Sequence, residues 1–444
     1  MSLLEKLGLD RPELRAWALY DWAASAMQTT IMVAVFPIYF VKVAGAGLAE
    51  SGATQRLATV NTIALVIIAL VSPLLGAVSD YRASKKRFLA VFMAVGVASV
   101  AGMFFIHTGD LGLASWLFTL SLIGVAGSFV FYEALLPHIA RPHEIDRVST
   151  AGYAIGYVGG GLLLALNLAW IQKPGWFGLP AGPGIGESAA TLPARLAFLS
   201  VAAWWVVFSI PLFRRVPEPP ARLETGEWRG ENPFRAAFGR LAETFHELRG
   251  YRQAFLMLLA FLIYNDGIQT IIKMATAYGT ELGIGQSALI GAILVVQFVG
   301  IPCSFLFGTL AGWIGAKRAL FLGLLAYTAI SILGFYMKTA AHFYVLAGLV
   351  GMVQGGTQAL SRSLFASMIP QHKSGEFFGF WSVFEKFAGI FGPLIFAGTI
   401  AATGSSRNAI LSVIGFFAVG AAILAFVDLD EGKRQARAAN AAAG

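Results

Sequence analysis

The sequence has few charged residues and almost no cysteine. Charged residues make up 13% of its 444 residues, whereas 57% are hydrophobic. A soluble domain usually carries about a quarter charged residues. The apolar residues fall in blocks of about 20, the length of helix that crosses a hydrocarbon core. Cys303 is the one cysteine, which excludes an internal disulfide and a multi-cysteine metal site. We therefore expect an all-α polytopic membrane protein.

Several functional signatures are also missing. The chain has no Gly-x-x-x-x-Gly-Lys-Ser/Thr phosphate loop, which argues against ATP-driven transport by this chain alone. Its six histidines form no ligand-like cluster and no nucleophile elbow is present, which argues against a membrane enzyme. We expect no metal and no cofactor. The polar N-terminal segment lacks the apolar core of a cleaved signal peptide, so we expect the first span to direct insertion.

Apolar runs bounded by charges, Gly or Pro predict twelve membrane spans. The first six are expected at 16–43, 57–78, 88–106, 114–135, 151–172 and 194–213, and the second six at 254–276, 287–310, 319–337, 342–366, 377–402 and 408–427.

Lys and Arg are concentrated in every second segment between these spans, at 82–87, 141–147, 214–252 and 317–318. This distribution predicts that both termini are cytoplasmic. It also explains the net charge of +8 without nucleic acid as a partner. We expect a monomer surrounded by lipid, in a bacterial inner (plasma) membrane.

The predicted organisation is an N-terminal six-helix bundle at 1–213, a cytoplasmic linker at 214–253 and a C-terminal six-helix bundle at 254–444 with a short disordered tail. In the linker, Asn232 and Pro233 begin a segment with Phe and Leu at helical spacing. It predicts an amphipathic helix on the membrane surface. A binding site for a soluble regulatory partner is the alternative.

The two halves resemble each other. Span one contains Tyr20-Asp21 followed by Gln28, and span seven contains Tyr264-Asn265-Asp266 followed by Gln269. After spans four and ten, similar segments run from a Pro through a polar turn with His into a helix rich in Gly and aromatics. Repeated halves with a binding site between them are typical of secondary transporters, in which one half rocks on the other.

Seven charged residues fall inside predicted spans and away from their ends, where each costs about 2.5–3.5 kcal/mol on insertion scales. They are Asp21, Glu133, Asp266, Lys273, Arg362, Glu385 and Lys386. We expect a solute pathway along two polar helical faces: one carries Asp266, Gln269, Thr270 and Lys273, and the other carries Asp21, Ser25 and Gln28.

Other expectations concern the remaining charges. Glu385 and Lys386 are adjacent and should point about 100° apart, so at most one should face any given spot in the pathway. Arg362 is a candidate partner for Glu385. A carboxylate in this set is a candidate site for a coupling proton. The alternative is that the charges pair only to hold the helices together.

A short motif follows span two. Gly76, Asp80, Arg82, Lys86 and Arg87 resemble the signature of the major facilitator superfamily. Gly76 would permit close helix approach, and Asp80 would accept a bond from the other half or from its own loop's cation, as a latch. The equivalent loop of the second half has Gly312 in place of the carboxylate, which puts a second latch in doubt. A plain cytoplasmic turn would explain the basic residues but not the Gly-to-Asp spacing.

Longer segments carry a more specific resemblance. ALYDWAASAMQTTIMVAVFPIYF, ALLPHIARPHEIDRVSTAGYAIGYVGGGLLLALNL, GGTQALSRSLFASMIP and GFWSVFEKFAGIFGPL resemble the "unknown major facilitator" family, whose eukaryotic relatives are autophagy-related vacuolar amino-acid effluxers. The resemblance implies the twelve-helix major facilitator fold with two pseudo-symmetric bundles, and transport of a small-molecule solute such as an amino acid. Glu133 departs from the amide expected there, which would alter the preferred solute charge. A non-transporting sensor or scaffold and a membrane enzyme are the competing functions.

The expected solute and ion pathway residues are Tyr20, Asp21, Gln28, Glu133, Tyr264, Asn265, Asp266, Gln269, Lys273, Arg362, Glu385 and Lys386.

Overall fold

The computed structural model of the protein describes residues 3–48, 50–180, 186–220, 250–389 and 391–442. Within these residues all regular structure is helical, and 12 spans are long and apolar enough to cross a membrane. The prediction of an all-α polytopic membrane protein with twelve spans is confirmed.

The N-terminal half contains the first six spans. Span one is made of α2 (Pro12–Ala26), η1 (Met27–Ala34), α3 (Phe36–Tyr39) and η2 (Phe40–Ala44), and the others are α4 (Glu50–Arg82), α5 (Lys85–Gly102), α6 (Leu111–Ile139), α7 (Ile145–Gln172) and α8 (Glu187–Arg215).

The C-terminal half contains the other six. They are α10 (Arg252–Glu281), α11 (Gln286–Ile314), α12 (Ala316–Phe335), α13 (Ala340–Ser367), α14 (Ser374–Phe387) with α15 (Phe391–Thr403), and α16 (Ser406–Ser412) with α17 (Ile414–Ala425).

The observed helices match the predicted spans but are often longer. Span four was expected at 114–135, whereas α6 runs from Leu111 to Ile139. Apolar composition marks only the part of a helix that lies in hydrocarbon, and polar turns can continue the same helix beyond it.

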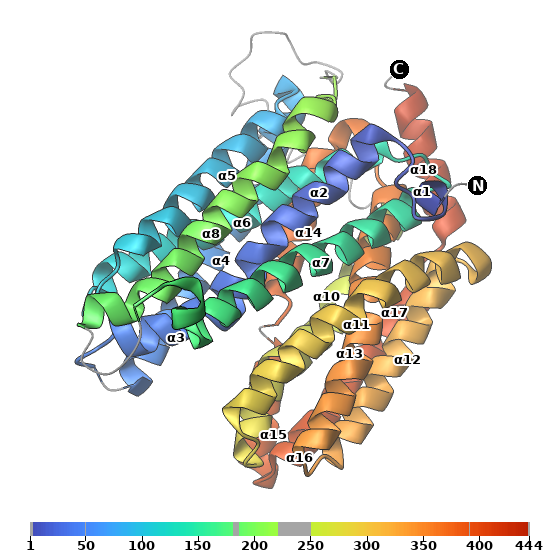
Figure 1. Cartoon of the computed structure of the whole chain (residues 1–444). Helices are drawn as coiled ribbons and strands as arrows, with labels where there is room; N and C mark the ends of the chain where they lie inside the picture. The colour runs from blue at the N-terminus through green and yellow to red at the C-terminus, as the bar shows by residue number, and fades with distance from the viewer. Residues whose placement is uncertain (1–2, 49, 181–185, 221–249, 390, 443–444) are drawn as a thin grey trace.

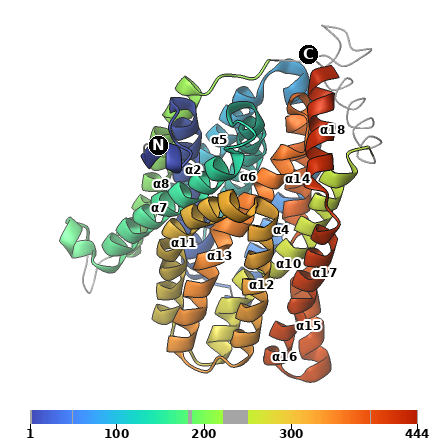
Figure 2. The same cartoon turned by 90° about the vertical axis from the view of Figure 1, so that its right-hand side faces the viewer.

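The two halves stand side by side, with α7 of the N-terminal half along α11 and α13 of the C-terminal half (Figure 1). The short helix α1 (Leu3–Lys6) and the last helix α18 (Leu429–Ala442) lie at one end of the molecule, which we call the terminal face. Helices α15 and α16 lie at the other end, the opposite face, in both views (Figures 1 and 2).

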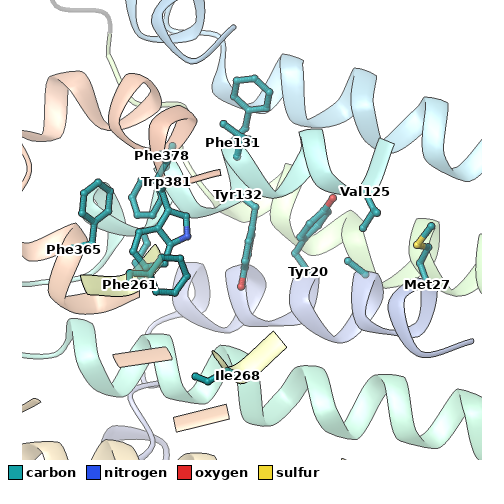
Figure 3. Packing of buried hydrophobic residues seen from close by; sticks show 14 of the residues in the cluster. Tyr20, Met27, Val125, Phe131, Tyr132, Phe261, Ile268, Phe365, Phe378 and Trp381 are labelled. Carbon is teal, nitrogen blue, oxygen red and sulfur yellow. The ribbon is translucent and has the colours of Figure 1, made fainter. Parts of the chain in front are cut away.

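Spans one, eleven and twelve are interrupted, the last of them between α16 and α17. Span one changes from α-helix to π-helix at Met27, a change that is frequent at functional sites. Span eleven is divided into α14 and α15, and between them Gly389 has a φ of +89°, which favours glycine. The indole of Trp381 in α14 stacks on Phe261 of α10, with ring centroids 3.9 Å apart (Figure 3).

The C-terminal tail was expected to be disordered, and this prediction is wrong. Residues 429–442 form α18. The Asp428 carboxylate accepts the backbone N–H groups of Asp430 and Glu431 at 3.0 Å each, and Arg434 donates to Glu431. A carboxylate that caps the helix start, an ion pair three residues apart and a high alanine content all stabilise a helix.

The predicted amphipathic helix of the linker lies outside the described residues, because it falls within 221–249. The division into a bundle at 1–213, a linker at 214–253 and a bundle at 254–444 stays a proposal.

Candidate functional site

A cavity of about 770 Å³ lies between the two halves. It is lined by α2, η1, α4, α6 and α7 from the N-terminal half and by α10 to α16 from the C-terminal half. On α13, which begins at the opposite face, the lining residues run from Phe343 to Gln354, so the cavity occupies the part of the molecule away from the terminal face.

The N-terminal wall of the cavity is acidic. Asp21 and Ser25 on α2, Gln28 on η1 and Glu133 on α6 all line it. The Ser25 hydroxyl donates to Asp21 Oδ1 at 3.2 Å, and the Tyr132 hydroxyl donates to Asp21 Oδ2 at 3.3 Å. The expected polar face of Asp21, Ser25 and Gln28 therefore does face the cavity.

Arg362 of the C-terminal half reaches into this acidic wall. Its Nη1 lies 3.9 Å from Asp21 Oδ2 and 3.8 Å from Glu133 Oε1. Its Nε donates to Ser149 Oγ, and its Nη2 donates to the Ser149 backbone oxygen, both at 3.0 Å. Arg362 is only 1% exposed and does not line the cavity, so it approaches the two carboxylates from behind the wall.

Aromatic rings enclose the guanidinium group. Its Cζ lies 4.9 Å from the ring centroid of Trp17, 5.8 Å from that of Tyr132 and 4.6 Å from that of Tyr153. Figure 3 shows Tyr132 beside Tyr20 in this packed region, and their ring centroids are 5.0 Å apart. Aromatic faces attract a cation without neutralising it, which suits a position where Arg362 has two carboxylate neighbours.

The C-terminal wall is rich in lysine. Gln269, Thr270 and Lys273 on α10 line the cavity, as do Glu385 and Lys386 near the end of α14. Lys386 Nζ lies 2.7 Å from Glu385 Oε2. Lys273 Nζ donates to the Gly389 backbone oxygen at 3.2 Å, and no carboxylate in the described part of the chain lies within ion-pair distance of it.

Two predictions about these charges are wrong. Glu385 is paired with Lys386 and not with Arg362, whose carboxylate neighbours among the described residues are Asp21 and Glu133. The adjacent pair also does not divide between the cavity and a neighbouring helix. Both side chains line the cavity, because α14 ends one residue later and long side chains at a helix end can turn toward each other.

Asp266 is placed differently from its prediction. It is 1% exposed and does not line the cavity. Its Oδ1 accepts the backbone N–H groups of Gly389 at 2.7 Å and Gly392 at 2.9 Å, and its Oδ2 accepts that of Phe391 at 3.1 Å. A break in span eleven leaves N–H groups without helical partners, and the carboxylate of α10 satisfies them. Asp266 thus caps the start of α15.

Three further predicted residues lie behind the walls. The Tyr20 ring is fully buried in the N-terminal half. The Tyr264 hydroxyl lies 2.5 Å from Ser361 Oγ, and Asn265 Oδ1 accepts a bond from Gln358 at 2.7 Å. These side chains join helices to each other, and none of them lines the cavity.

The motif after span two lies at the terminal face, where it contacts the other half. The Asp80 carboxylate is paired with Lys85 and accepts the Glu376 backbone N–H at 2.9 Å. A Cβ added to Gly76 would collide with the Gly375 backbone oxygen, so the two helices meet backbone to backbone. Both partners foreseen for Asp80, a cation of its own loop and a group of the other half, are present.

The other basic residues of the motif do not contact Asp80. Lys86 Nζ donates to the backbone oxygens of Phe213 at 3.0 Å and Val216 at 2.6 Å, at the end of α8. Arg82 and Arg87 are exposed. Lys85, which belongs to the same basic cluster as Lys86 and Arg87, is the cation that pairs with Asp80.

The two similar turns of the halves also contact each other at the terminal face. His138 Nε2 lies 2.9 Å from Ser374 Oγ, and Gln371 Nε2 donates to the Pro137 backbone oxygen at 2.7 Å. Ser149 Oγ donates to the Ala359 backbone oxygen at 2.8 Å. None of these described residues lines the cavity, so these links between the halves lie at the closed end.

Sequence reasoning missed the partners that complete these contacts. They are Trp17, Tyr132, Ser149 and Tyr153 around Arg362, and Gly375 and Glu376 against the motif. Gly375 and Glu376 begin α14, in the segment that resembles the one after span four, so the repeat was the available signal. Among the described residues, no group of three His, Cys, Asp or Glu side chains could hold a metal ion.

The fold and the central cavity define a class of protein. A solved structure with this architecture is that of the major facilitator proton:xylose symporter XylE, with a TM-score of 0.66, 16% sequence identity and 98% of each chain covered. The chain therefore has the major facilitator fold.

The family follows from the sequence. Residues 56–437 match the model of the family described as "Vacuole effluxer Atg22 like", and the chain belongs to this family. It is 37% identical over 420 residues to the uncharacterized MFS-type transporter YxiO of Bacillus subtilis, covering 93% of this chain and 94% of that one. It is 26% identical to autophagy-related protein 22 of Yarrowia lipolytica, covering 67% of this chain and 52% of that protein. The chain is thus an integral, multi-pass membrane transporter.

Proposed function

We propose that this transporter moves a small zwitterionic solute of the amino-acid type across the membrane by alternating access. The observation that carries the proposal is the opposite charge of the two cavity walls. On one side, Asp21 and Glu133 both lie within 4 Å of Arg362 Nη1, and two carboxylates with one guanidinium leave one negative charge. Lys273 and Lys386 line the other side together with Glu385, which leaves one positive charge among the cavity-lining groups. Asp266 interacts with Lys273 from behind this wall, where its carboxylate accepts three backbone N–H groups.

A zwitterion complements both walls. Its ammonium group would bind near Asp21 and Glu133, and its carboxylate would bind near Lys273 and Lys386. Charge-assisted hydrogen bonds of this kind are about twice as strong as neutral ones. A cavity of about 770 Å³ also lies in the range of small-ligand sites.

Alternating access is supported by the one-sided contacts between the halves. The contacts of Gly76, Asp80, His138 and Gln371 with the other half all lie at the terminal face. Separation of these contacts, with closure at the opposite face, would expose the same cavity to the other side of the membrane.

The orientation proposed from the basic segments places the terminal face in the cytoplasm. With a bacterial relative such as YxiO, the inner membrane is the proposed location. We propose a monomer driven by a solute or proton gradient.

The proposal is tested with purified protein by thermal-shift measurements on neutral amino acids. Each amino acid is compared with the amine that lacks its carboxylate and with the acid that lacks its ammonium group. We expect stabilisation by the complete zwitterion only. Lys273→Gln should weaken amino-acid binding by at least about tenfold, because a hydrogen bond to a charged group contributes about 1.5–3 kcal/mol.

Lys273→Gln should not change the response of the protein to the amine, since the amine has no carboxylate to bind this wall. Arg434→Gln, which changes an exposed side chain of α18, serves as the matched control. Equal binding of the amine and the amino acid by the wild-type protein would refute the zwitterion site. Counterflow of the stabilising solute in proteoliposomes then separates a transporter from a sensor or scaffold.

A further inference from the structure

Four exposed arginines lie at the ends of three helices at the terminal face. Arg82 ends α4, Arg87 lies in the first turn of α5, and Arg214 and Arg215 lie in the last turn of α8. All four are exposed, and none has a hydrogen bond or an ion pair with another described residue. Four guanidinium groups without an anionic partner in the described part of the chain form a positive surface that fits an anion.

Lys86 joins the helices that carry these arginines. Its Nζ donates to the backbone oxygens of Phe213 at 3.0 Å and Val216 at 2.6 Å, at the end of α8. Those two residues flank Arg214 and Arg215 in the chain, and Arg87 directly follows Lys86. The start of α5 and the end of α8 therefore hold their arginines in one place.

The nearby carboxylate of Glu218 belongs to the backbone of α5. Its Oε2 accepts the N–H of Lys86 at 2.9 Å, and it interacts with the charges of Lys85 and Lys86. This carboxylate caps the start of α5, so the N–H groups there are not the anion site. The arginines remain available to a ligand.

Apolar side chains continue from the arginines along both helices. Helices α5 and α8 pack on each other on the outer side of the N-terminal half, away from the C-terminal half (Figure 1). Val91, four residues after Arg87, is 60% exposed, and Ile210, four residues before Arg214, is 40% exposed. A spacing of four residues places both members of each pair on the same helical face. Each of these two lipid-facing surfaces thus ends in an arginine.

A phospholipid combines the two kinds of group that complement this surface. Its phosphate can accept two parallel N–H bonds from one guanidinium group, and its acyl chains can cover the apolar side chains below. The orientation of the protein in the membrane requires basic residues on this side. It does not require them to converge without partners above two adjacent apolar faces.

We infer that Arg87 and Arg214, with Arg82 and Arg215 beside them, bind the phosphate of an anionic phospholipid in the leaflet at the terminal face. The acyl chains of this lipid lie on the exposed faces of α5 and α8. An anionic lipid is favoured over a zwitterionic one because its headgroup carries no cation to be repelled by the arginines. The inference concerns the lipid and does not depend on the solute of the proposed function.

Native mass spectrometry of the full chain, purified and delipidated in a neutral detergent, tests the inference by counting bound lipid. The protein is titrated with phosphatidylglycerol, with phosphatidylcholine of the same acyl chains, and with glycerol 3-phosphate, which has the phosphate but no acyl chains. We expect the first phosphatidylglycerol to bind at least about tenfold more tightly than phosphatidylcholine. Glycerol 3-phosphate should bind much more weakly, because it makes no apolar contact with α5 and α8.

Paired substitutions locate the bound lipid. Arg87→Gln with Arg214→Gln should weaken phosphatidylglycerol binding about thirtyfold, as expected for the loss of two arginines near the membrane surface. Arg87→Lys with Arg214→Lys keeps both charges but not the paired N–H groups, so it should retain part of the affinity. Arg434→Gln with Arg437→Gln removes the same number of exposed arginines from α18 and should bind phosphatidylglycerol as the wild type does.

Three results would overturn the inference. Equal binding of phosphatidylglycerol and phosphatidylcholine by the wild type would show no preference for an anionic lipid. Equal losses in the two double glutamine variants would show that only the total charge matters. Binding of glycerol 3-phosphate as tight as that of phosphatidylglycerol would assign the arginines to a free phosphate. Melting temperatures in lipid-free detergent identify any loss of folding in the glutamine variant, in which case the lysine variant must bind phosphatidylglycerol more weakly than the wild type.

Discussion

Because Asp266 caps α15, replacing one of its carboxylate oxygens by an amide nitrogen should lower the stability of the protein. In Asp266→Asn, the amide oxygen can keep the bonds from Gly389 and Gly392, but the amide nitrogen faces the Phe391 N–H as a second donor. One bond to a charged group is lost, and the two others lose their ionic contribution. With about 1.5–3 kcal/mol for a bond to a charged group, we expect a loss of about 2–4 kcal/mol.

Because Asp266 is 1% exposed, solvent does not screen this effect. A change of about 1 kcal/mol shifts the melting temperature of a domain of about 150–250 residues, the size of one half of this chain, by about 2–4 °C, so the expected decrease is on the order of 10 °C. Hydrogen exchange measured by mass spectrometry should also show faster exchange of the Phe391 and Gly392 amides, while α14 stays protected.

Asp428→Asn is the matched control. Asp428 also accepts two backbone N–H groups at a helix start, but its carboxylate is exposed to solvent. We expect a smaller decrease in melting temperature for this variant. If Asp266→Asn melts at the wild-type temperature and the amides at 391–392 exchange at the wild-type rate, Asp266 does not hold α15.

Two more substitutions test the terminal face. Gly76→Ala would place a methyl group against the Gly375 backbone oxygen, so the terminal face should close less completely. With Cys303→Ser removing the one native thiol, a Ser79→Cys thiol at this buried contact should then be labelled by maleimide several-fold faster. Gly348→Ala, in open space on α13, should leave labelling unchanged, and equal labelling of the two variants would contradict the backbone contact. Asn440→Ala removes the bond that Asn440 Oδ1 accepts from the Gln371 N–H at 2.8 Å. Since Gln371 also bonds to Pro137 of the other half, we expect a decrease of about 1 kcal/mol in stability and a modest increase in labelling. An unchanged melting temperature and unchanged labelling would show that α18 does not stabilise closure.

The sequence predicted the spans and the charged positions well, because both follow from the energy of placing groups in hydrocarbon. Asp21, Glu133 and Lys273 were recognised by their cost in an apolar run, and the structure brings them to one cavity. The partners could not be predicted, because sequence spacing fixes which residues share a helical face but not which helices meet. For this reason Glu385 was predicted to pair with Arg362, whereas Asp21 and Glu133 are its neighbours in the structure.

The break in span eleven is indicated by the sequence, although it was not predicted. Gly389, Gly392 and Pro393 follow each other closely, and Pro favours the first turn of a new helix. Recognition of that break would have placed unpaired N–H groups near Asp266 of span seven. The tail helix was missed in a similar way, although Asp428 and the pair Glu431 and Arg434 are ordinary signs of a helix start.

The division of span eleven has a consequence for molecules that bind this transporter from outside. Helix α14 packs mainly on α4 and α6 of the N-terminal half, whereas α15 packs on α10 and α16 of its own half. Since no continuous helix joins α14 to α15, an antibody fragment that clamps α15 to α16 would leave α14 free to part from α4. An inhibitor of movement would have to wedge between α14 and α4, where Gly379 lies against Pro73.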